Sequence, residues 1–207
     1  MSVTGTIAVT CPACDHVTDC QLVQSINART EPQLKQRLLA GELNVLECAC
    51  GRRSQLAATV LFHDPDADYY AQVVAPDDAA MAKAALLFKL SGATGTQRLV
   101  PSQNALVEKV KLLDANLADG AIEMAKVLLL ASRDASDLDR VMLFDRADAD
   151  TIHWILYDGA VAEPAASARA AYDKLASSAA ARPARGELRI DRAWAVIALQ
   201  ALIAGGN

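Results

Sequence analysis

The stretches TCPACDHVTDC (residues 10–20) and LECACGRR (residues 46–53) hold the five cysteines of the chain. Cys11 and Cys14 have the CxxC spacing with which two thiolates of one tight turn reach a common ion, and Cys48 and Cys50 form a second, closer pair. A tetrahedral zinc site needs four such donors, brought together from two loops. The sequence therefore predicts one Zn²⁺ bound by Cys11, Cys14, Cys48 and Cys50.

Other uses of these cysteines stay open. Cys20 or His16 could replace one thiol of the CxC pair as a ligand, although a lone cysteine on an apolar strand is more often a buried small hydrophobe. Cys11 and Cys14 could instead form a redox pair, but the pattern lacks the helix that follows the motif in thioredoxin-type sites. The thiols could also hold no metal at all.

The sequence around the cysteines predicts a β-rich unit with one inserted helix. Residues 6–10 and 17–24 are β-prone and bracket the first cysteine pair, which suits a hairpin over a metal knuckle. A helix is expected over residues 31–40, because Thr30 and Gln33 have capping-box spacing, Pro32 suits a first turn and Gly41 suits a stop. Further strands are expected directly before the second cysteine pair and in residues 56–64 and 69–75, of which the last two should form a hairpin.

Residues 76–207 are expected to form a mainly helical α+β domain that follows the zinc-ribbon-like domain of residues 1–75. The segment RVMLFDRADADTIHWILYDG (residues 140–159) predicts a β-hairpin that turns at residues 147–150. The composition of residues 91–102 is typical of a linker. Helices are expected in residues 77–91, 104–117, 120–132, 167–181 and 191–204, with a short strand at 187–190. The fold class is therefore predicted as α+β.

The helix expected at residues 104–117 has a clear amphipathic pattern. Its apolar residues recur at spacings of four, three and four, which places them on one face of a helix. The sequence predicts that this face points inward and that Glu108, Lys109 and Lys111 point outward. The inward residues are Leu106, Val110, Leu113 and Leu117.

The order of several short motifs resembles the CpXC family of bacterial and archaeal proteins. Members of that family carry two CPxC motifs, with a SIN triplet and an LKxxLLxGELN helix between them and an HDP triplet after them. This chain has CPAC at 11–14, SIN at 25–27, LKQRLLAGELN at 34–44 and HDP at 63–65. The resemblance is specific over residues 7–75 and continues more loosely through residues 104–129. It implies a zinc-ribbon-like module and implies no enzymatic activity.

The second cysteine motif departs from the family pattern. When Cys50 and Gly51 are aligned with the final CG of that motif, Glu47 stands where the family has its first cysteine, and Cys48 follows one position later. Cys48 can serve through a tighter loop, or Glu47 or Cys20 can take its place as a ligand. We expect Cys48 to serve, which keeps four thiolates around the zinc.

Charge argues against a nucleic-acid partner. The net charge of the chain is −5, and residues 1–75 carry five basic against eight acidic side chains, a balance of −3. Phosphate backbones attract the opposite sign. Arg52 and Arg53, directly after the second cysteine pair, are the feature that keeps a nucleic-acid-binding zinc ribbon as an alternative.

The function expected from the sequence is that of a non-catalytic, zinc-binding module for protein interaction or scaffolding, with an unidentified protein partner. Four thiolates would leave the metal no open coordination position. The three histidines are scattered, and no serine stands in a nucleophile-elbow motif. An enzyme of another type remains a third alternative. The N-terminus lacks a basic segment followed by an apolar run, so we expect no secretory signal, a cytoplasmic location and no membrane partner.

Overall fold

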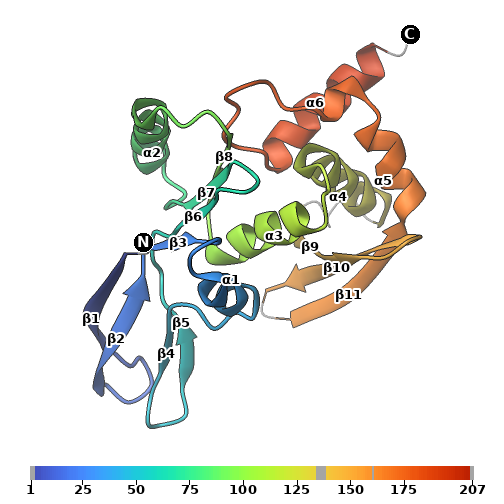
Figure 1. Cartoon of the computed structure of the whole chain (residues 1–207). Coiled ribbons are helices and arrows are strands. Elements are labelled where there is room, and N and C mark those ends of the chain that lie inside the picture. Colours follow the sequence, from blue (N-terminus) through green and yellow to red (C-terminus); the bar gives the residue numbers. More distant parts are fainter. Residues whose placement is uncertain (1–2, 134–138, 160, 206–207) are drawn as a thin grey trace. The chain divides into compact units, whose positions relative to one another are not determined.

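The computed structural model describes residues 3–133, 139–159 and 161–205 (Figure 1). These residues form six α-helices and eleven β-strands, which confirms the α+β class. The chain divides into two compact units, a first unit of residues 1–107 and a second unit of residues 108–207. Within the described residues, no helix is long and apolar enough to cross a membrane.

Two small antiparallel hairpins of the first unit carry the cysteines. In one, β1 (Thr4–Thr10) pairs with β2 (Val17–Val23), from Thr4 opposite Val23 to Thr10 opposite Val17. In the other, β4 (Val45–Glu47) pairs with β5 (Arg53–Gln55). Both hairpins turn at a cysteine pair. The hairpin expected over the first pair is confirmed, whereas β5, after the second pair, is a strand that we did not expect.

The inserted helix α1 (Pro32–Leu39) lies between the hairpins in the sequence and starts differently from the expectation. Its N-cap is Glu31, without a side-chain cap bond, so the predicted capping box of Thr30 and Gln33 is wrong. The reason is local, because the Asn27 side chain accepts from the backbone N–H of Thr30 at 3.2 Å and holds that residue in a turn. Gly41 ends the helix at a φ of +69°, as expected.

A four-stranded mixed sheet completes the strands of the first unit. Its order is β3 (Ser25–Asn27), β6 (Leu61–Asp64), β7 (Tyr69–Val73) and β8 (Thr96–Val100). Helix α2 (Asp78–Ser91) connects β7 to β8, begins at the Asp77 N-cap and ends at Gly92 with a φ of +68°.

The linker expected at residues 91–102 is wrong, because that segment contains β8. This strand pairs in parallel with β7, and its residues Arg98, Leu99 and Val100 are buried. Parallel pairing across a helix depends on a distant strand, which the local composition does not reveal. Strands on both sides of residue 75 thus share one sheet, and a boundary there between independently folding domains stays a prediction.

The second unit combines helices with a three-stranded antiparallel sheet. The sheet order is β11 (Val161–Ala168), β10 (Thr151–Asp158) and β9 (Val141–Ala147), so the hairpin predicted near residues 140–158 is confirmed, and β11 is a third strand that we did not expect. The strand expected at residues 187–190 is wrong, since that segment has no sheet partner in the described chain. The helices and short 3-10 helix are α3 (Gln103–Asp114, shared with the first unit), α4 (Asp119–Arg133), α5 (Arg169–Ala176), η2 (Ala179–Ala181) and α6 (Arg192–Ala204).

The core of the second unit forms around α4, which buries most of its length as expected. Trp154 of β10 is 1% exposed, lies edge-on to Phe144 and donates its indole N–H to Ser167. Gly120 lets α4 approach closely, because a Cβ there would collide with the Ala181 carbonyl oxygen and the Trp194 ring. Aromatic and small residues therefore fix the packing of α4 against the elements around it.

Helix α3 corrects the predicted orientation of two charged residues. Leu106 and Val110 are buried, as expected, but Leu112 is buried while Leu113 is only partly so. The helix stops at Asp114, so Leu117, which is buried, lies beyond it. The outward direction predicted for Glu108 and Lys109 is wrong, since they are 3% and 4% exposed. Fewer residues of α3 are therefore exposed to solvent than the spacing of its apolar residues predicts.

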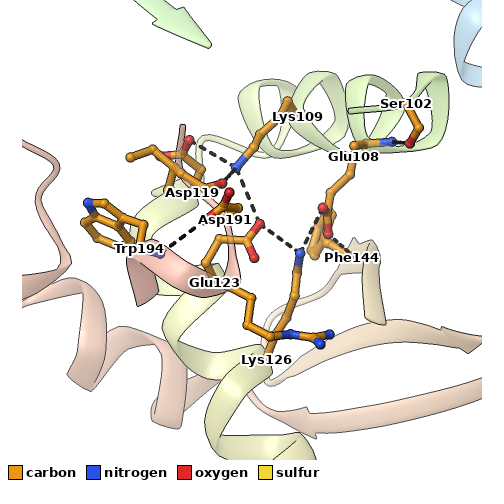
Figure 2. A network of polar contacts seen from close by, with 12 residues as sticks. Ser102, Glu108, Lys109, Asp119, Glu123, Lys126, Phe144, Asp191 and Trp194 are labelled. Carbon is orange, nitrogen blue, oxygen red and sulfur yellow. Dashed lines mark hydrogen bonds and ion pairs between the residues drawn. The ribbon is translucent and has the colours of Figure 1, made fainter. Parts of the chain in front are cut away.

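The buried charges of α3 pair with charges of α4 (Figure 2). Lys126 lies 2.9 Å from a carboxylate oxygen of Glu108 and 2.9 Å from one of Glu123. The other oxygen of Glu108 accepts the backbone N–H of Phe144 in β9 at 2.5 Å. One carboxylate therefore satisfies both a buried ammonium and a buried backbone donor.

Lys109 extends the same network (Figure 2). Its ammonium lies 3.3 Å from Asp119 and 3.5 Å from Glu123, and it donates to the backbone carbonyl of Ile190 at 3.0 Å. The backbone carbonyl of Ile190 thus forms its hydrogen bond with the Lys109 side chain instead of with a neighbouring strand. Each of the buried charges Glu108, Lys109 and Lys126 thus has an oppositely charged partner, and Glu108 and Lys109 also have a backbone hydrogen bond, as buried charges require.

Candidate metal centre

The two cysteine turns bring four sulfur atoms into one small volume. The Sγ atoms of Cys11, Cys14, Cys48 and Cys50 all lie within 4.8 Å of one another. The Sγ atoms of Cys11 and Cys50 are 3.7 Å apart, and those of Cys14 and Cys48 are 3.5 Å apart. Both of these contacts run between the two hairpins, and each turn supplies two donors.

The backbone of each turn folds to present its pair. The N–H of Cys11 donates to the His16 carbonyl, and the Cys11 carbonyl accepts from Asp15, both at 2.9 Å. In the second turn, the N–H of Cys48 donates to Arg52 and the Cys48 carbonyl accepts from Gly51, again at 2.9 Å. Gly51 has a φ of +84°, which glycine adopts without strain. The tighter CxC loop thus closes in the same manner as the CxxC loop.

The spacing of the sulfurs fits a tetrahedral zinc ion. Four sulfurs at about 2.3 Å from a tetrahedral centre lie about 3.8 Å from one another. The observed contacts of 3.7 and 3.5 Å are close to this value. The donor set itself, four thiols on two turns, is the one that structural zinc sites use.

The centre is half-buried, with one cysteine of each pair inside. Cys11 and Cys48 are buried, whereas Cys14 and Cys50 are exposed. The buried pair packs with Cys20 and Leu46 in a small apolar cluster, which Val9 and Leu56 complete. This cluster lacks the size of a normal domain core, so the hairpins have little apolar burial with which to hold their shape.

The residues weighed as substitute ligands lie outside the group of four. Cys20 is 7% exposed, and its thiol points at the Thr18 carbonyl oxygen at 3.7 Å. Glu47 forms an ion pair with Arg53 at 3.4 Å. His16 is exposed and contributes its backbone carbonyl to the first turn. Among the described residues, the geometry thus groups the four thiols without these three side chains.

Local hydrogen bonds separate the pKa values of the thiols. The backbone N–H of Ala13 lowers the pKa of Cys11 to about 7, against the opposing effect of burial. The backbone N–H of His16 also lowers the pKa of Cys14, but contacts with Cys50 and the other sulfurs outweigh it and raise that pKa to about 12. Without a cation, one thiolate of the group forms readily and the thiol next to it stays protonated.

Asn44 holds the first hairpin beside the second, a role that sequence reasoning missed. It is 2% exposed, and its side chain accepts from the Val23 N–H at 2.7 Å and donates to the Val23 carbonyl at 3.0 Å. Its own φ is +54°, and Gln55 of β5 donates to its carbonyl at 2.9 Å. Asn44 thus completes the edge of β2 and connects it to the β4–β5 hairpin. Asparagine tolerates a positive φ better than most residues, and this preference is the one property of Asn44 that indicates from sequence a special backbone position.

The geometry defines a class of protein in which two β-hairpins bring two cysteine pairs together at a candidate metal site. The chain belongs to the CpXC family, whose model, described as CpXC protein, matches residues 9–126. The resemblance noted from the sequence motifs is thereby confirmed. The comparisons with curated proteins and with solved structures find no match to the chain.

Proposed function

We propose that Cys11, Cys14, Cys48 and Cys50 bind one structural Zn²⁺. The observation that carries this proposal is the set of four sulfurs within 4.8 Å of one another, contributed by two hairpin turns. The ion would offset part of the charge of the four thiolates and hold the two hairpins together. A cluster as small as that of Cys20, Leu46 and their neighbours cannot do so alone.

The role that fits such a site is a non-catalytic module for protein interaction or scaffolding. Four thiolates complete the tetrahedron of zinc and leave no position for a substrate or an activated water. The metal then stabilises two exposed hairpins, and their surfaces are available for contact with a protein. A test is affinity capture with the wild type and with Cys14→Ser. A partner retained by the wild type and lost with the zinc supports the module, and capture unaffected by zinc loss contradicts it.

A nucleic-acid-binding role receives little support from the two arginines that suggested it. Arg53 is paired with Glu47 at 3.4 Å, and the Arg52 side chain donates to Ser54 at 3.2 Å. The ion pair with Glu47 weakens the attraction that Arg53 offers phosphate, whereas Arg52 keeps its charge beside the uncharged Ser54. The negative balance of residues 1–75 opposes phosphate binding further. We therefore keep protein interaction as the single proposed function.

Zinc analysis of four purified proteins, the wild type and the Cys14→Ser, Cys20→Ser and Cys48→Ser variants, tests the site. The wild type and Cys20→Ser should each contain about one zinc per chain, because four ligands remain in both. Cys14→Ser should lose the zinc, since three thiolates leave one of the four tetrahedral positions without its thiolate and hold the ion less tightly. Wild type without zinc after growth in adequate metal contradicts the site. Zinc lost on changing Cys20 but retained on changing Cys48 would assign the fourth ligand to Cys20.

A further inference from the structure

Strand β1 has an exposed, uncharged free edge. Its seven residues, TGTIAVT, contain no charged side chain and no proline, and all are exposed or partly exposed. In the described part of the chain, β2 is the strand paired with β1, on one side (Figure 1). Ile7 at the centre of the strand is 41% exposed. Natural sheets normally protect such an edge with charge, proline or a covering element.

The hydrogen bonds at the two ends of the hairpin show which residues face the free edge. At one end the Val3 carbonyl accepts from Gln24, and at the other the Cys11 N–H donates to His16. Residues alternate along an antiparallel strand, so the odd-numbered residues of β1 direct their N–H and C=O groups toward β2. The residues that direct theirs outward are Thr4, Thr6, Ala8 and Thr10.

Strand β11 shows how this protein protects another edge. The Arg169 N–H donates to Asp150 across the β10–β11 pair, so by the same alternation the even-numbered residues of β11 face its free edge. Pro164 is one of them and offers no N–H, and Glu163 places a charge next to it. An incoming strand would find a gap in the donors of β11. Strand β1 contains neither device.

We propose that β1 pairs antiparallel with β1 of a second copy of this chain, with the two-fold axis at Ile7. Thr4 then faces Thr10 of the second copy and Thr6 faces Ala8, all outward-directed residues that exchange hydrogen bonds in pairs. Ile7 faces Ile7 at a non-hydrogen-bonded position, where the side chains approach most closely. The inference rests on the proposed function only in that zinc holds the β1–β2 hairpin in shape.

Self-complementarity favours a second copy over an unrelated strand. With the axis at Ile7, the threonines at the two ends of β1 face each other, and the residues between them that face each other are β-branched or small. No like charges face each other. The pairing also closes, because β2 becomes the outer strand and Asn44 occupies the edge of β2 at Val23. A closed two-fold dimer, rather than an open-ended fibre, is the expected product.

Charge variants at Ile7 test the register. The zinc-loaded wild type should sediment as a dimer whose fraction rises with concentration. Ile7→Lys and Ile7→Glu should each weaken self-association by about tenfold or more, because like charges then lie directly opposite. A mixture of the two should restore association, since lysine then faces glutamate. The matched control Val17→Lys, an exposed site on β2, should leave the dimer unchanged.

Ala8→Pro separates hydrogen bonding from charge. It removes an outward-directed N–H, keeps the bonds between β1 and β2 and should also dissociate the dimer. A wild type that is monomeric but contains stoichiometric zinc would overturn the proposed dimer and leave the proposed zinc site standing. Binding of a foreign strand to β1 of such a monomer would likewise overturn the proposed dimer. Failure of the I7K and I7E mixture to associate overturns the register. Zinc content measured on every variant shows separately whether the proposed function fails.

Discussion

At the scale of single residues, Lys126 carries a buried charge of the second unit that two carboxylates hold in place. Burial alone would lower its pKa, but Glu108 and Glu123 outweigh that effect and the opposing charge of Lys109, so the pKa lies above the ordinary 10.5. A group with a raised pKa in the folded state stabilises the fold fully below its unfolded pKa and loses that contribution as the pH rises through the folded value. The ammonium therefore stabilises the second unit at neutral pH.

We predict that Lys126→Met lowers the free energy of unfolding by about 3–5 kcal/mol at pH 7, because it leaves carboxylates buried without their partner. The difference between wild type and variant should shrink as the pH rises above 10.5 and through the higher folded pKa of Lys126, where the folded wild type loses its ammonium. Urea unfolding followed by circular dichroism at pH 7 and above pH 10.5 measures both effects. Lys174→Met, at an exposed lysine of α5, is the control. A difference that stays constant with pH would contradict the role assigned to Lys126.

Asn44 concentrates several constraints on one residue. Asn44→Ala should lower the free energy of unfolding of the first unit by about 2–4 kcal/mol, because it leaves the N–H and C=O of Val23 without partners and places alanine at a positive φ. Chemical denaturation of the zinc-loaded protein measures the change. Gln24→Ala, next to the same strand end, should cost far less, and equal costs would show that the side-chain bridge contributes little.

At the scale of elements, Gly120 decides how close α4 comes to its neighbours. Gly120→Ala improves helix propensity by about 1 kcal/mol. The new Cβ would nevertheless collide with the Ala181 backbone, and such overpacking costs about 1–3 kcal/mol or more. We expect net destabilisation in thermal unfolding. The control is Gly5→Ala, which should be neutral or stabilising, because no atom beyond the adjacent residues lies within 4 Å of the added Cβ. A stabilising Gly120→Ala would mean that α4 shifts to accommodate the methyl group.

Elements with a local signal could be predicted from the sequence, and those that depend on distant partners could not. Asp77 and Gly92 mark both ends of α2, and alternation marks the hairpin of β9 and β10. Strand β8 could not be predicted because its partner β7 is separated from it in the sequence by helix α2. Glu108 and Lys109 were placed outside because periodicity weighs only polarity, whereas their partners on α4 make burial tolerable.

The grouping of the cysteines followed from spacing, since each pair lies on one turn between strands. The supporting residue Asn44 did not, because its partner Val23 is 21 positions away in the sequence. Cys20 also illustrates the limit of spacing. It stands near the first pair in the sequence, but strand alternation directs its thiol to the Thr18 carbonyl rather than to the group. Ligand sets depend on the direction of side chains, which a strand fixes only once its register is known.

At the scale of the whole molecule, the two units should respond differently to removal of the proposed zinc ion. A strong chelator should abolish hydrogen-exchange protection in β1, β2, β4 and β5, because those hairpins bury few apolar side chains. The amides of α4 and β10, in the core of the second unit, should keep their protection. Cys14→Ser without chelator should reproduce the pattern. Loss of protection in both units at once would show that they unfold as one.

The placement of Trp154 and Trp194 has a practical consequence. They are the only two tryptophans of the chain, and both belong to the second unit. Trp154, enclosed beside Phe144, should emit at short wavelength until the β9–β11 sheet opens. Indole fluorescence should therefore report the second unit and remain constant while the cysteine hairpins lose their order. A preparation judged native by its emission spectrum can thus contain a first unit that has lost the proposed zinc. Cobalt substitution, which colours thiolate sites, is the optical probe suited to that unit.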